Sequence, residues 1–366
     1  MGNSIKKISG LGDAFAAARI QDVFPMMLDA ANASVARISA HIDARGSDAL
    51  ATDVETTHFA ADVIFRTIFS EPIGARRSEE IFRAFNLFQE VGFALGLLGL
   101  ARVPTGLMPS AWRGQSAARK IRLKLQAPLR QRLDAIEAGR PTPEADILAA
   151  LIRARDPETG RPFDEAELLD QVANIFLAGH ETSATMLAWA LYLLASCPHL
   201  QDRAHAEISA VIGANAPTFD DVKRLEFLRE VVRETLRLYP PVPFLVRDTA
   251  KQEVIGERSM EEGSLVFVPV WLLQRNTNIW SNADAFDPDR FGTADGQEAA
   301  RCAYMPFSAG PRVCIGAAFA MQETVLYLAA LLQAFRVHTS EGHTPEPVAR
   351  MTLRSSNGVP LVFERR

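Results

Sequence analysis

The stretch FSAGPRVCIG, residues 307–316, sets one cysteine, Cys314, among glycines, a proline and an arginine. It runs directly into IGAAFAMQETVLYLAALL, whose small and apolar residues are typical of a buried helix. A cysteine in such a loop can be a buried hydrophobe, half of a disulfide, a nucleophile or a metal ligand. Which of these roles Cys314 has decides the fold and the function that the rest of the chain predicts.

The composition is that of a globular protein with few cysteines. The chain has 366 residues, of which 48% are hydrophobic, and a net charge of −5, which argues against nucleic acid as its main partner. Its cysteines, Cys197, Cys302 and Cys314, are odd in number and irregularly spaced, so a disulfide framework is not expected. An iron–sulfur cluster would need about four. Thiols that stay reduced predict a cytoplasmic protein.

Hydrophobic periodicity predicts a mainly α-helical protein with small β-sheets, folded as one domain over residues 1–366. Strand-like runs are confined to the last third of the chain. SLVFVPV (264–270) is β-branched, and MTLRSSNGVPLVF (351–363) carries Asn357-Gly358 between two apolar arms, which predicts a hairpin. Helical patterns cover residues 14–44, 51–70, 77–92, 113–138, 144–155, 164–195, 198–212, 225–239 and 314–335.

The segment at residues 172–195 is apolar enough to raise the question of a membrane span. Its centre carries His180, Glu181 and Thr182, however, and ionisable groups at mid-bilayer are costly. We therefore expect a helix buried in the core of a protein that has no membrane span. In such a helix the Glu181 carboxylate needs a partner or a function.

The neighbours of Cys314 favour a metal ligand over the other three roles. No histidine stands out in the sequence as a base for a cysteine nucleophile. Gly310 and Gly316 permit tight turns and the close approach of a bulky group. The start of a helix brings N–H groups to the sulfur and stabilises a thiolate. With the cation of Arg312 two residues away, such a thiolate suits a large anionic iron cofactor.

The same loop carries a family signature. Phe307, Gly310, Arg312, Cys314 and Gly316 reproduce the pattern Phe-x-x-Gly-x-Arg-x-Cys-x-Gly. The chain therefore resembles the cytochrome P450 family, the haem-thiolate monooxygenases. The resemblance implies the cytochrome P450 fold, with haem b (iron protoporphyrin IX) as cofactor. It makes Cys314 the axial ligand of the iron and the other four residues part of the cofactor-binding loop.

Three further segments match the family in its order along the chain. AGHETS (178–183) resembles the oxygen-activating helix motif, ETLR (234–237) resembles the Glu-x-x-Arg helix, and FDPDRF (286–291) resembles the segment before the haem loop. The resemblance therefore does not depend on the cysteine loop alone.

In the helix motif the resemblance implies catalytic roles for Glu181 and Thr182. An acid followed by a hydroxyl can hold water and relay protons during oxygen activation. Ala178 and Gly179 would leave room for oxygen against the helix backbone. The structural alternative for Thr182 is a hydroxyl that only bonds back to a helix carbonyl.

Charged residues carry the remaining implied roles. Glu234 and Arg237 lie three apart on one helix face and can pair. From the residues alone, the alternative is a solvated surface pair that stabilises little. The resemblance implies instead a buried network in which Arg290 joins them behind the haem loop. It also implies that Arg247 and Arg312 bind the haem propionates.

The function implied is insertion of one oxygen atom from O2 into an apolar organic substrate. Electrons would come from separate donors, a ferredoxin or flavodoxin with its reductase. The alternatives are a peroxide-driven peroxygenase and a degenerate or truncated, non-catalytic haem-binding relative. The apolar stretch 91–109 would be a mobile lid over the substrate entrance or, alternatively, a buried loop. The basic stretch 113–132 is typical of the solvated face of one helix, with docking of a redox partner as the alternative.

The beginning of the chain departs from the family pattern. Family members carry, ahead of the region that residues 14–38 resemble, an N-terminal strand, several helices and a helix with a Trp-x-x-x-Arg/His-like pattern. Here the first tryptophan is Trp112. We therefore expect an N-terminally incomplete fold, which lacks one set of propionate donors, binds haem weakly and turns over poorly.

Overall fold

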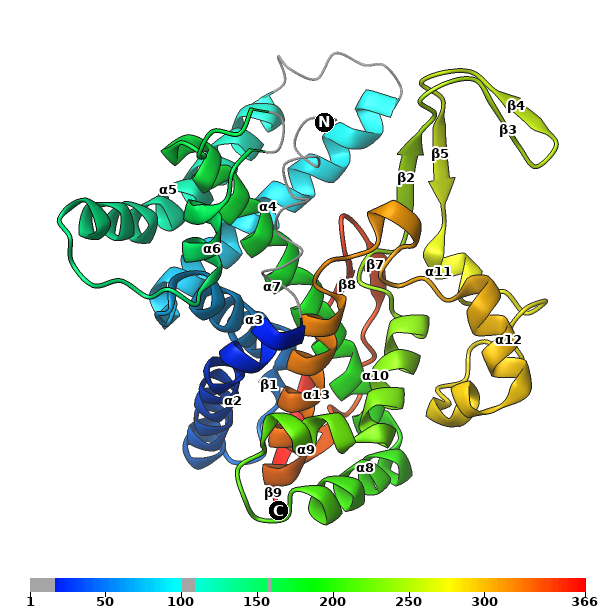
Figure 1. Ribbon diagram of the computed structural model, residues 1–366. Coiled ribbons are helices and arrows are strands. Elements are labelled where there is room, and N and C mark those ends of the chain that lie inside the picture. Colours follow the sequence, from blue (N-terminus) through cyan, green and yellow to red (C-terminus); the bar gives the residue numbers. More distant parts are fainter. Residues whose placement is uncertain (1–16, 101–108, 157–158) are drawn as a thin grey trace.

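The structure, a computed structural model, describes residues 17–100, 109–156 and 159–366. Within these residues the fold is mainly helical with small sheets, as predicted (Figure 1). The helices are α2 (Ala17–Arg45), α3 (Thr52–Phe69), α4 (Ala75–Leu100), α5 (Pro109–Glu137), α6 (Ile147–Arg153), α7 (Glu165–Ser196), α8 (Pro198–Val211), α9 (Phe219–Arg224), α10 (Glu226–Leu238), α11 (Val270–Leu273), α12 (Ala294–Ala303) and α13 (Ala317–Ala334).

The strands form four small antiparallel sheets among the described residues. The largest has the order β1-β9-β6, and the others pair β2 with β5, β3 with β4, and β7 with β8. The strands are β1 (Leu50–Ala51), β2 (Leu245–Asp248), β3 (Glu253–Ile255), β4 (Arg258–Met260), β5 (Leu265–Val268), β6 (Phe335–Thr339), β7 (Pro347–Ala349), β8 (Leu353–Ser355) and β9 (Pro360–Arg365).

The prediction of a hairpin at Asn357-Gly358 is wrong. Gly358 has the positive φ of 82° that a turn glycine supplies, but the turn joins β8 to β9, and these strands belong to different sheets. The Asn357 amide instead bonds to the backbone of Thr344 and Glu346. The apolar side chains of β9 lie in the core against β6, where Phe363 pairs with Val337. Burial of those side chains outweighs the local hairpin preference.

Helix α7 runs through the middle of the molecule (Figure 1) and contacts α3, α5, α10 and α13. Its start is fixed by a capping box, in which Asp164 and Glu167 each accept a hydrogen bond from the other's backbone N–H. Most of the helix is buried, including Trp189, Leu187 and Leu191. Each such side chain contributes about 1.5–3 kcal/mol by burial. The helix is therefore a rigid base for the residues it carries.

Helix α13 follows the cysteine loop and packs against α2, α7, α8 and α10. Among the described helices, it alone is long and apolar enough to cross a membrane, and 67% of it is buried inside the protein. A core helix passes the same test of length and composition. Its first residue is Ala317, so Cys314 precedes the helix by three residues.

The stretch predicted as a lid or buried loop is partly helical. Residues 91–100 continue α4, whereas residues 101–108 lie outside the described part of the chain. The glycines in this stretch disfavour a helix by about 1 kcal/mol each. Packing on α5 opposes this cost, because a Cβ at Gly114 would lie only 3.0 Å from the Val91 side chain. The short helices α9, α11 and α12 were also not predicted.

Candidate functional site

The cysteine loop is held by its own backbone. Cys314 N–H donates to the carbonyl of Phe307 at 2.8 Å, and Ser308 N–H donates to that of Met305 at 3.0 Å. Gly310 has a φ of +67°, a left-handed conformation that glycine adopts without strain. A Cβ at Gly316, by contrast, would meet only the Cys314 sulfur, at 3.9 Å. The positive φ therefore accounts for glycine at position 310, whereas the close approach of a bulky group at Gly316 stays a prediction.

The loop does not favour a Cys314 thiolate in the way predicted. Although Cys314 is exposed, neighbouring atoms of the chain partly shield its thiol from water and raise its pKa, and the Gly316 backbone N–H opposes this only in part. The helix dipole does not reverse the direction, because α13 begins three residues later. Deprotonation of Cys314 would thus have to come from a bound metal, which removes the proton of a coordinating thiol.

The surroundings of Cys314 fit a flat, apolar and anionic group. Cys314 and its neighbours Val313 and Ile315 are exposed, 53% and 44% for the two aliphatic side chains, so three consecutive apolar residues face solvent. Arg312 is exposed beside them. Cationic side chains at the edge of an apolar surface can bind the carboxylates of a ligand whose face is apolar, as haem's is.

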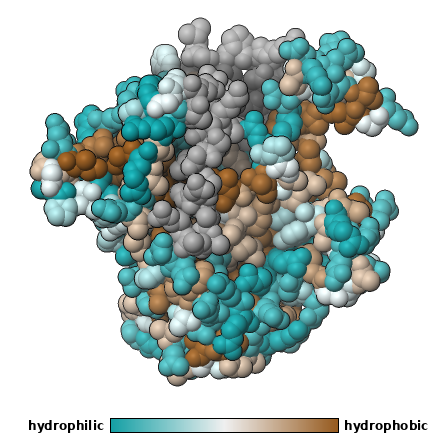
Figure 2. Space-filling model, in the orientation of Figure 1, coloured by the Kyte–Doolittle hydropathy of each residue, from teal (hydrophilic) through white to brown (hydrophobic). Residues whose placement is uncertain are grey.

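Arg247 completes this surface from the β2–β5 sheet. Its Nη2 donates to Ser308 Oγ at 3.0 Å, which ties the strand to the cysteine loop. In its sheet, exposed Val246 pairs with exposed Phe267, and Figure 2 shows apolar surface where these strands lie. The structure therefore brings the two arginines predicted to bind propionates to the same region as Cys314.

On α7, Ala178 and Thr182 share one face, and Gly179 lies on another. Ala178 is exposed, and Thr182 Oγ1 donates to its carbonyl oxygen at 2.7 Å. A Cβ at Gly179 would lie 3.1 Å from two carbons of Ile64 in α3. Glycine at position 179 thus allows α3 and α7 to pack closely, a reason that the sequence did not predict. The Thr182 bond is the back-bonding geometry named as its structural alternative.

Glu181 is buried in an ion pair that the sequence did not predict. Its side chain is 1% exposed, both carboxylate oxygens bind the Arg354 guanidinium, and Thr352 Oγ1 donates to Oε1 at 2.7 Å. Burial acts to raise its pKa, but the charge and hydrogen bonds of Arg354 outweigh burial and lower it. His180 Nε2 lies 4.0 Å from the carboxylate. Glu181 is therefore ionised and directed to β8, not to Thr182.

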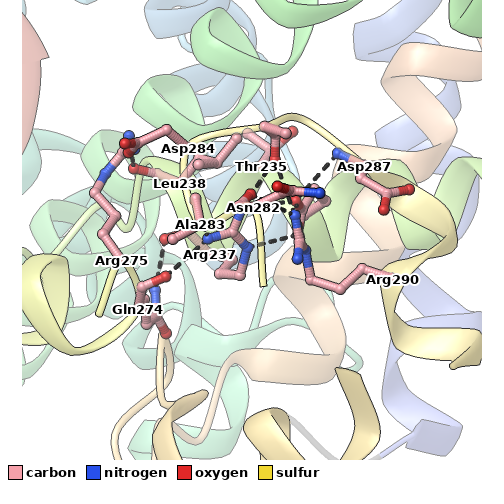
Figure 3. Close-up of polar contacts among 12 residues, drawn as sticks. Thr235, Arg237, Leu238, Gln274, Arg275, Asn282, Ala283, Asp284, Asp287 and Arg290 are labelled. Carbon is pink, nitrogen blue, oxygen red and sulfur yellow. Dashed lines mark hydrogen bonds and ion pairs between the residues drawn. The ribbon is translucent and has the colours of Figure 1, made fainter. Parts of the chain in front are cut away.

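Glu234, Arg237 and Arg290 meet in a buried network. Arg237 binds both oxygens of Glu234, at 2.8 Å each, and Arg290 Nε donates to Glu234 Oε1 at 3.2 Å. The two residues of α10 are fully buried, and Arg290 is 5% exposed. The remaining N–H groups of both arginines donate to backbone carbonyls of residues 274–285, as Figure 3 shows for Ala283. The alternative, a solvated surface pair of Glu234 and Arg237, is therefore wrong.

Gln274 connects this network to the cysteine loop, and sequence reasoning missed it. Its Nε2 donates to the carbonyls of Leu236 and Arg237, while its Oε1 accepts from the Met305 N–H at 3.0 Å. The side chain is fully buried, and Figure 3 shows it beside Arg237. An isolated glutamine carries no sequence signal of such a role. Through it, the start of the loop that presents Cys314 is braced against α10.

A second buried carboxyl, Glu323, joins α13 to α7. Ser183 Oγ donates to its Oε2 at 3.1 Å, one residue beyond Thr182. Burial raises the pKa of Glu323 to about 8, so the group is protonated at neutral pH. This contact brings the helix that follows Cys314 against the turn of α7 that carries Thr182.

The high pKa of Glu323 predicts a pH-dependent stability. The unfolded chain loses this proton near pH 4.5 and the folded one near pH 8, so stability is lost as the pH rises between these values. We expect Glu323→Gln to be more stable than the wild type by about 1–3 kcal/mol at pH 8, and the difference to shrink at pH 5. Urea unfolding at the two pH values measures it. A pH-independent difference would contradict a neutral Glu323.

Four basic residues in this stretch of α5 form ion pairs within the molecule. Arg122 pairs with Asp170, Lys124 with Glu80, and Arg130 with Glu165. These pairs join α5 to α4 and α7. Arg132, at the end of the stretch, is buried and binds Asp146 at 2.7 Å. Arg132 therefore departs from the predicted solvated face, whereas Arg113, Arg119 and Lys120 are exposed, and docking of a redox partner on this stretch stays a prediction.

Comparison with known proteins agrees with this geometry. The sequence matches the Cytochrome P450 family over residues 13–360. The chain belongs to the cytochrome P450 family. Among solved structures, it is similar to the cytochrome P450DA heme domain, with a TM-score of 0.83 and 25% identity over 98% of this chain and 76% of that one. The predicted family and fold are thus confirmed.

Two curated relatives show how much of the sequence this chain shares with them. The chain is 33% identical to cytochrome P450 714D1 of Oryza sativa subsp. japonica, over 96% of this chain and 64% of the relative. It is 32% identical to cyclooctat-9-en-7-ol 5-monooxygenase of Streptomyces melanosporofaciens, over 77% of this chain and 60% of the relative. The chain thus spans less than two thirds of the length of these cytochrome P450 relatives. Membership of the family implies haem as the cofactor.

Proposed function

We propose that this cytochrome P450 is a haem-thiolate monooxygenase that inserts one oxygen atom from O2 into an apolar organic substrate. The observation that carries the proposal is the exposed Cys314 loop, which two arginines flank and the buried Glu234 network braces. Cys314 would bind the iron of haem b, and Arg247 and Arg312 its propionates. Haem held by a thiolate supplies the electron density that favours O–O cleavage.

Two residues of α7, Thr182 and Glu181, would bind water and transfer protons. The Thr182 hydroxyl lies on the face of α7 where Ala178 is exposed. Its oxygen can therefore accept a hydrogen bond from a water molecule while its O–H donates to the Ala178 carbonyl. Glu181, one residue earlier, is a carboxylate that can take up a proton and release it. In the structure Arg354 holds it away from Thr182. Turnover therefore requires the Glu181 carboxyl to leave this ion pair at one stage.

The substrate class and electron donors belong to the same proposal. Two relatives are named for oxidation of cyclooctat-9-en-7-ol and of 11-oxo-beta-amyrin, the second from Glycyrrhiza uralensis, which supports an organic substrate. The separate donors, a ferredoxin or flavodoxin with its reductase, rest on the family resemblance. A cytoplasmic location is supported by the cysteines, all three of which are free thiols.

Thr182→Ala tests the proposal. Haem content and substrate binding should be retained, because Thr182 bonds only to its own helix. Product formed per NADH should fall by about tenfold or more, with a matching rise in peroxide, because proton delivery loses its hydroxyl. Oxygen uptake, peroxide and product are measured with a surrogate ferredoxin and reductase. Thr67→Val is the control, since that hydroxyl makes the same kind of back-bond, to Val63.

Unchanged coupling in Thr182→Ala would contradict a catalytic role for this residue. Product formed with peroxide and without an electron donor would favour the peroxygenase alternative. Haem binding without turnover in either assay would favour the non-catalytic one.

A further inference from the structure

Ser308, in the cysteine loop, has a backbone conformation that serine rarely adopts. Its φ is +65°, and among the residues that the structure describes only Ser70 and Asn282 share a positive φ without being glycine. This left-handed region is strained for residues with a Cβ, whereas glycine adopts it freely, as Gly310 does in the same loop. A strained residue at a binding site points to a role for its side chain.

The Ser308 hydroxyl is bonded to an arginine. Arg247 Nη2 donates to Ser308 Oγ at 3.0 Å, although the two residues are 61 apart in the chain. Serine hydroxyls often bond to backbone groups nearby, but within the described residues Ser308 Oγ has no such bond. The side chain that the strained backbone presents is therefore used for Arg247.

Backbone hydrogen bonds fix this hydroxyl relative to Cys314. The Ser308 N–H donates to the Met305 carbonyl at 3.0 Å. The carbonyl of Phe307, directly before Ser308, accepts from the Cys314 N–H at 2.8 Å. Ser308 is also half-buried. Its Oγ is thus a fixed acceptor in the loop that presents the cysteine.

The Arg247 guanidinium has a second neutral acceptor and no anion. Its Nη1 donates to the Val246 carbonyl at 2.9 Å, so these two bonds use two of its five N–H donors. Within the described residues no carboxylate pairs with it. Asp248 follows in the strand, but successive side chains of a strand point to opposite faces. The exposed guanidinium is therefore held in one orientation while its charge stays available to an anion.

We propose that Ser308 is a positioning residue of the cofactor site, whose hydroxyl holds the Arg247 guanidinium ready for a carboxylate of haem. The proposal rests on the proposed function, in which Arg247 binds a propionate. An arginine side chain has many rotamers, and a site that has already fixed one of them loses less entropy when the ligand binds. The strand alone does not fix it, because β2 holds only the Arg247 backbone, through its pairing with Val266.

The test compares the release of haem with that of haem dimethyl ester, which lacks free carboxylates, from the loaded chain to an excess of apomyoglobin. Ser308→Ala should speed the release of haem by about threefold to tenfold, because it removes a hydrogen bond to a charged group. Arg247→Met should speed it by about tenfold or more. Neither substitution should change the release of the dimethyl ester. A residue that only supports the fold of the loop would affect both porphyrins alike.

Two further variants separate the positioning role from other effects. Ser308→Ala in the Arg247→Met background should not speed haem release any further, since the hydroxyl acts through the arginine. Ser70→Ala is the matched control. Ser70 has a φ of +60°, is half-buried and donates its hydroxyl hydrogen to the Asp146 carboxylate at 2.8 Å, but it lies at the end of α3. Ser70→Ala should release both porphyrins as the wild type does.

Crystal structures of the cofactor-free wild type and of Ser308→Ala give a readout without haem. Arg247 should occupy one conformation in the wild type and several in the variant. Unchanged haem release in Ser308→Ala, an equal effect on haem and its dimethyl ester, or an equally ordered Arg247 in both structures would overturn the positioning role and leave the proposed function intact. Unchanged haem release in Arg247→Met would instead count against propionate binding by Arg247, which belongs to the proposed function.

Discussion

Arg237→Met is expected to lower the free energy of unfolding by about 3–5 kcal/mol, because it leaves the fully buried Glu234 carboxylate without its main partner. The substitution also removes donors to the carbonyls of Gln274, Ala283 and Ala285. Each buried acceptor left unpaired adds to the cost. Because Gln274 joins this network to Met305, the loop that presents Cys314 should lose order as well.

The chain supplies a matched control for this variant. Glu298 and Arg301 repeat the Glu-x-x-Arg spacing on α12, but both are well exposed. Arg301→Met should therefore change the stability by less than about 1 kcal/mol. Urea unfolding of the two variants and the wild type measures the difference. Equal effects of the two substitutions would show that burial of the Glu234 network does not matter to the fold.

Arg354→Met is expected to have the second-largest effect, a loss of about 2–4 kcal/mol at pH 7, because Glu181 remains buried without a cation. The pH dependence of the free energy of unfolding should change sign. In the wild type the lowered pKa of Glu181 contributes stability above pH 4.5, which is lost as the pH falls through the folded value. In the variant, burial, the largest influence on this pKa, is opposed only by Thr352 and His180 and raises it, so the variant should gain stability as the pH falls.

A double-mutant cycle separates the ion pair from other effects of this substitution. Glu181→Gln with Arg354→Met removes both charges, so the double variant should be more stable than the sum of the two single changes predicts, by about 1–3 kcal/mol. Strict additivity would mean that the two side chains do not interact. The measurement is urea unfolding of the four proteins at pH 5 and pH 7.

The helices were predicted well where local signals and packing agree. The pattern at residues 164–195 corresponds to α7 within one residue at each end, because Asp164 and Glu167 form a capping box ahead of the apolar run. Prediction failed where distant contacts decide. Residues 91–100 are helical despite their glycines, and Asn357-Gly358 redirects the chain because β9 pairs with β6 and β1.

The site shows the same division. The Cys314 loop and the Glu234–Arg237 pair are local patterns, and Arg290 followed from the resemblance. The partners of Glu181 were missed, because Arg354 lies 173 residues further along the chain and no local pattern links the two. The thiolate of Cys314 was predicted from a helix start, whereas the structure starts α13 only at Ala317 and raises the thiol pKa.

The most direct test is the carbon-monoxide difference spectrum of the reduced, haem-reconstituted chain and of Cys314→Ser. The wild type should give a Soret band near 450 nm, as the family's name records, because the ligand is a thiolate. Cys314→Ser should lose this band while its far-UV circular dichroism stays helical, since Cys314 is exposed and lies outside the core. A 450 nm band that survives in Cys314→Ser would assign the ligand to another residue and contradict the site described above.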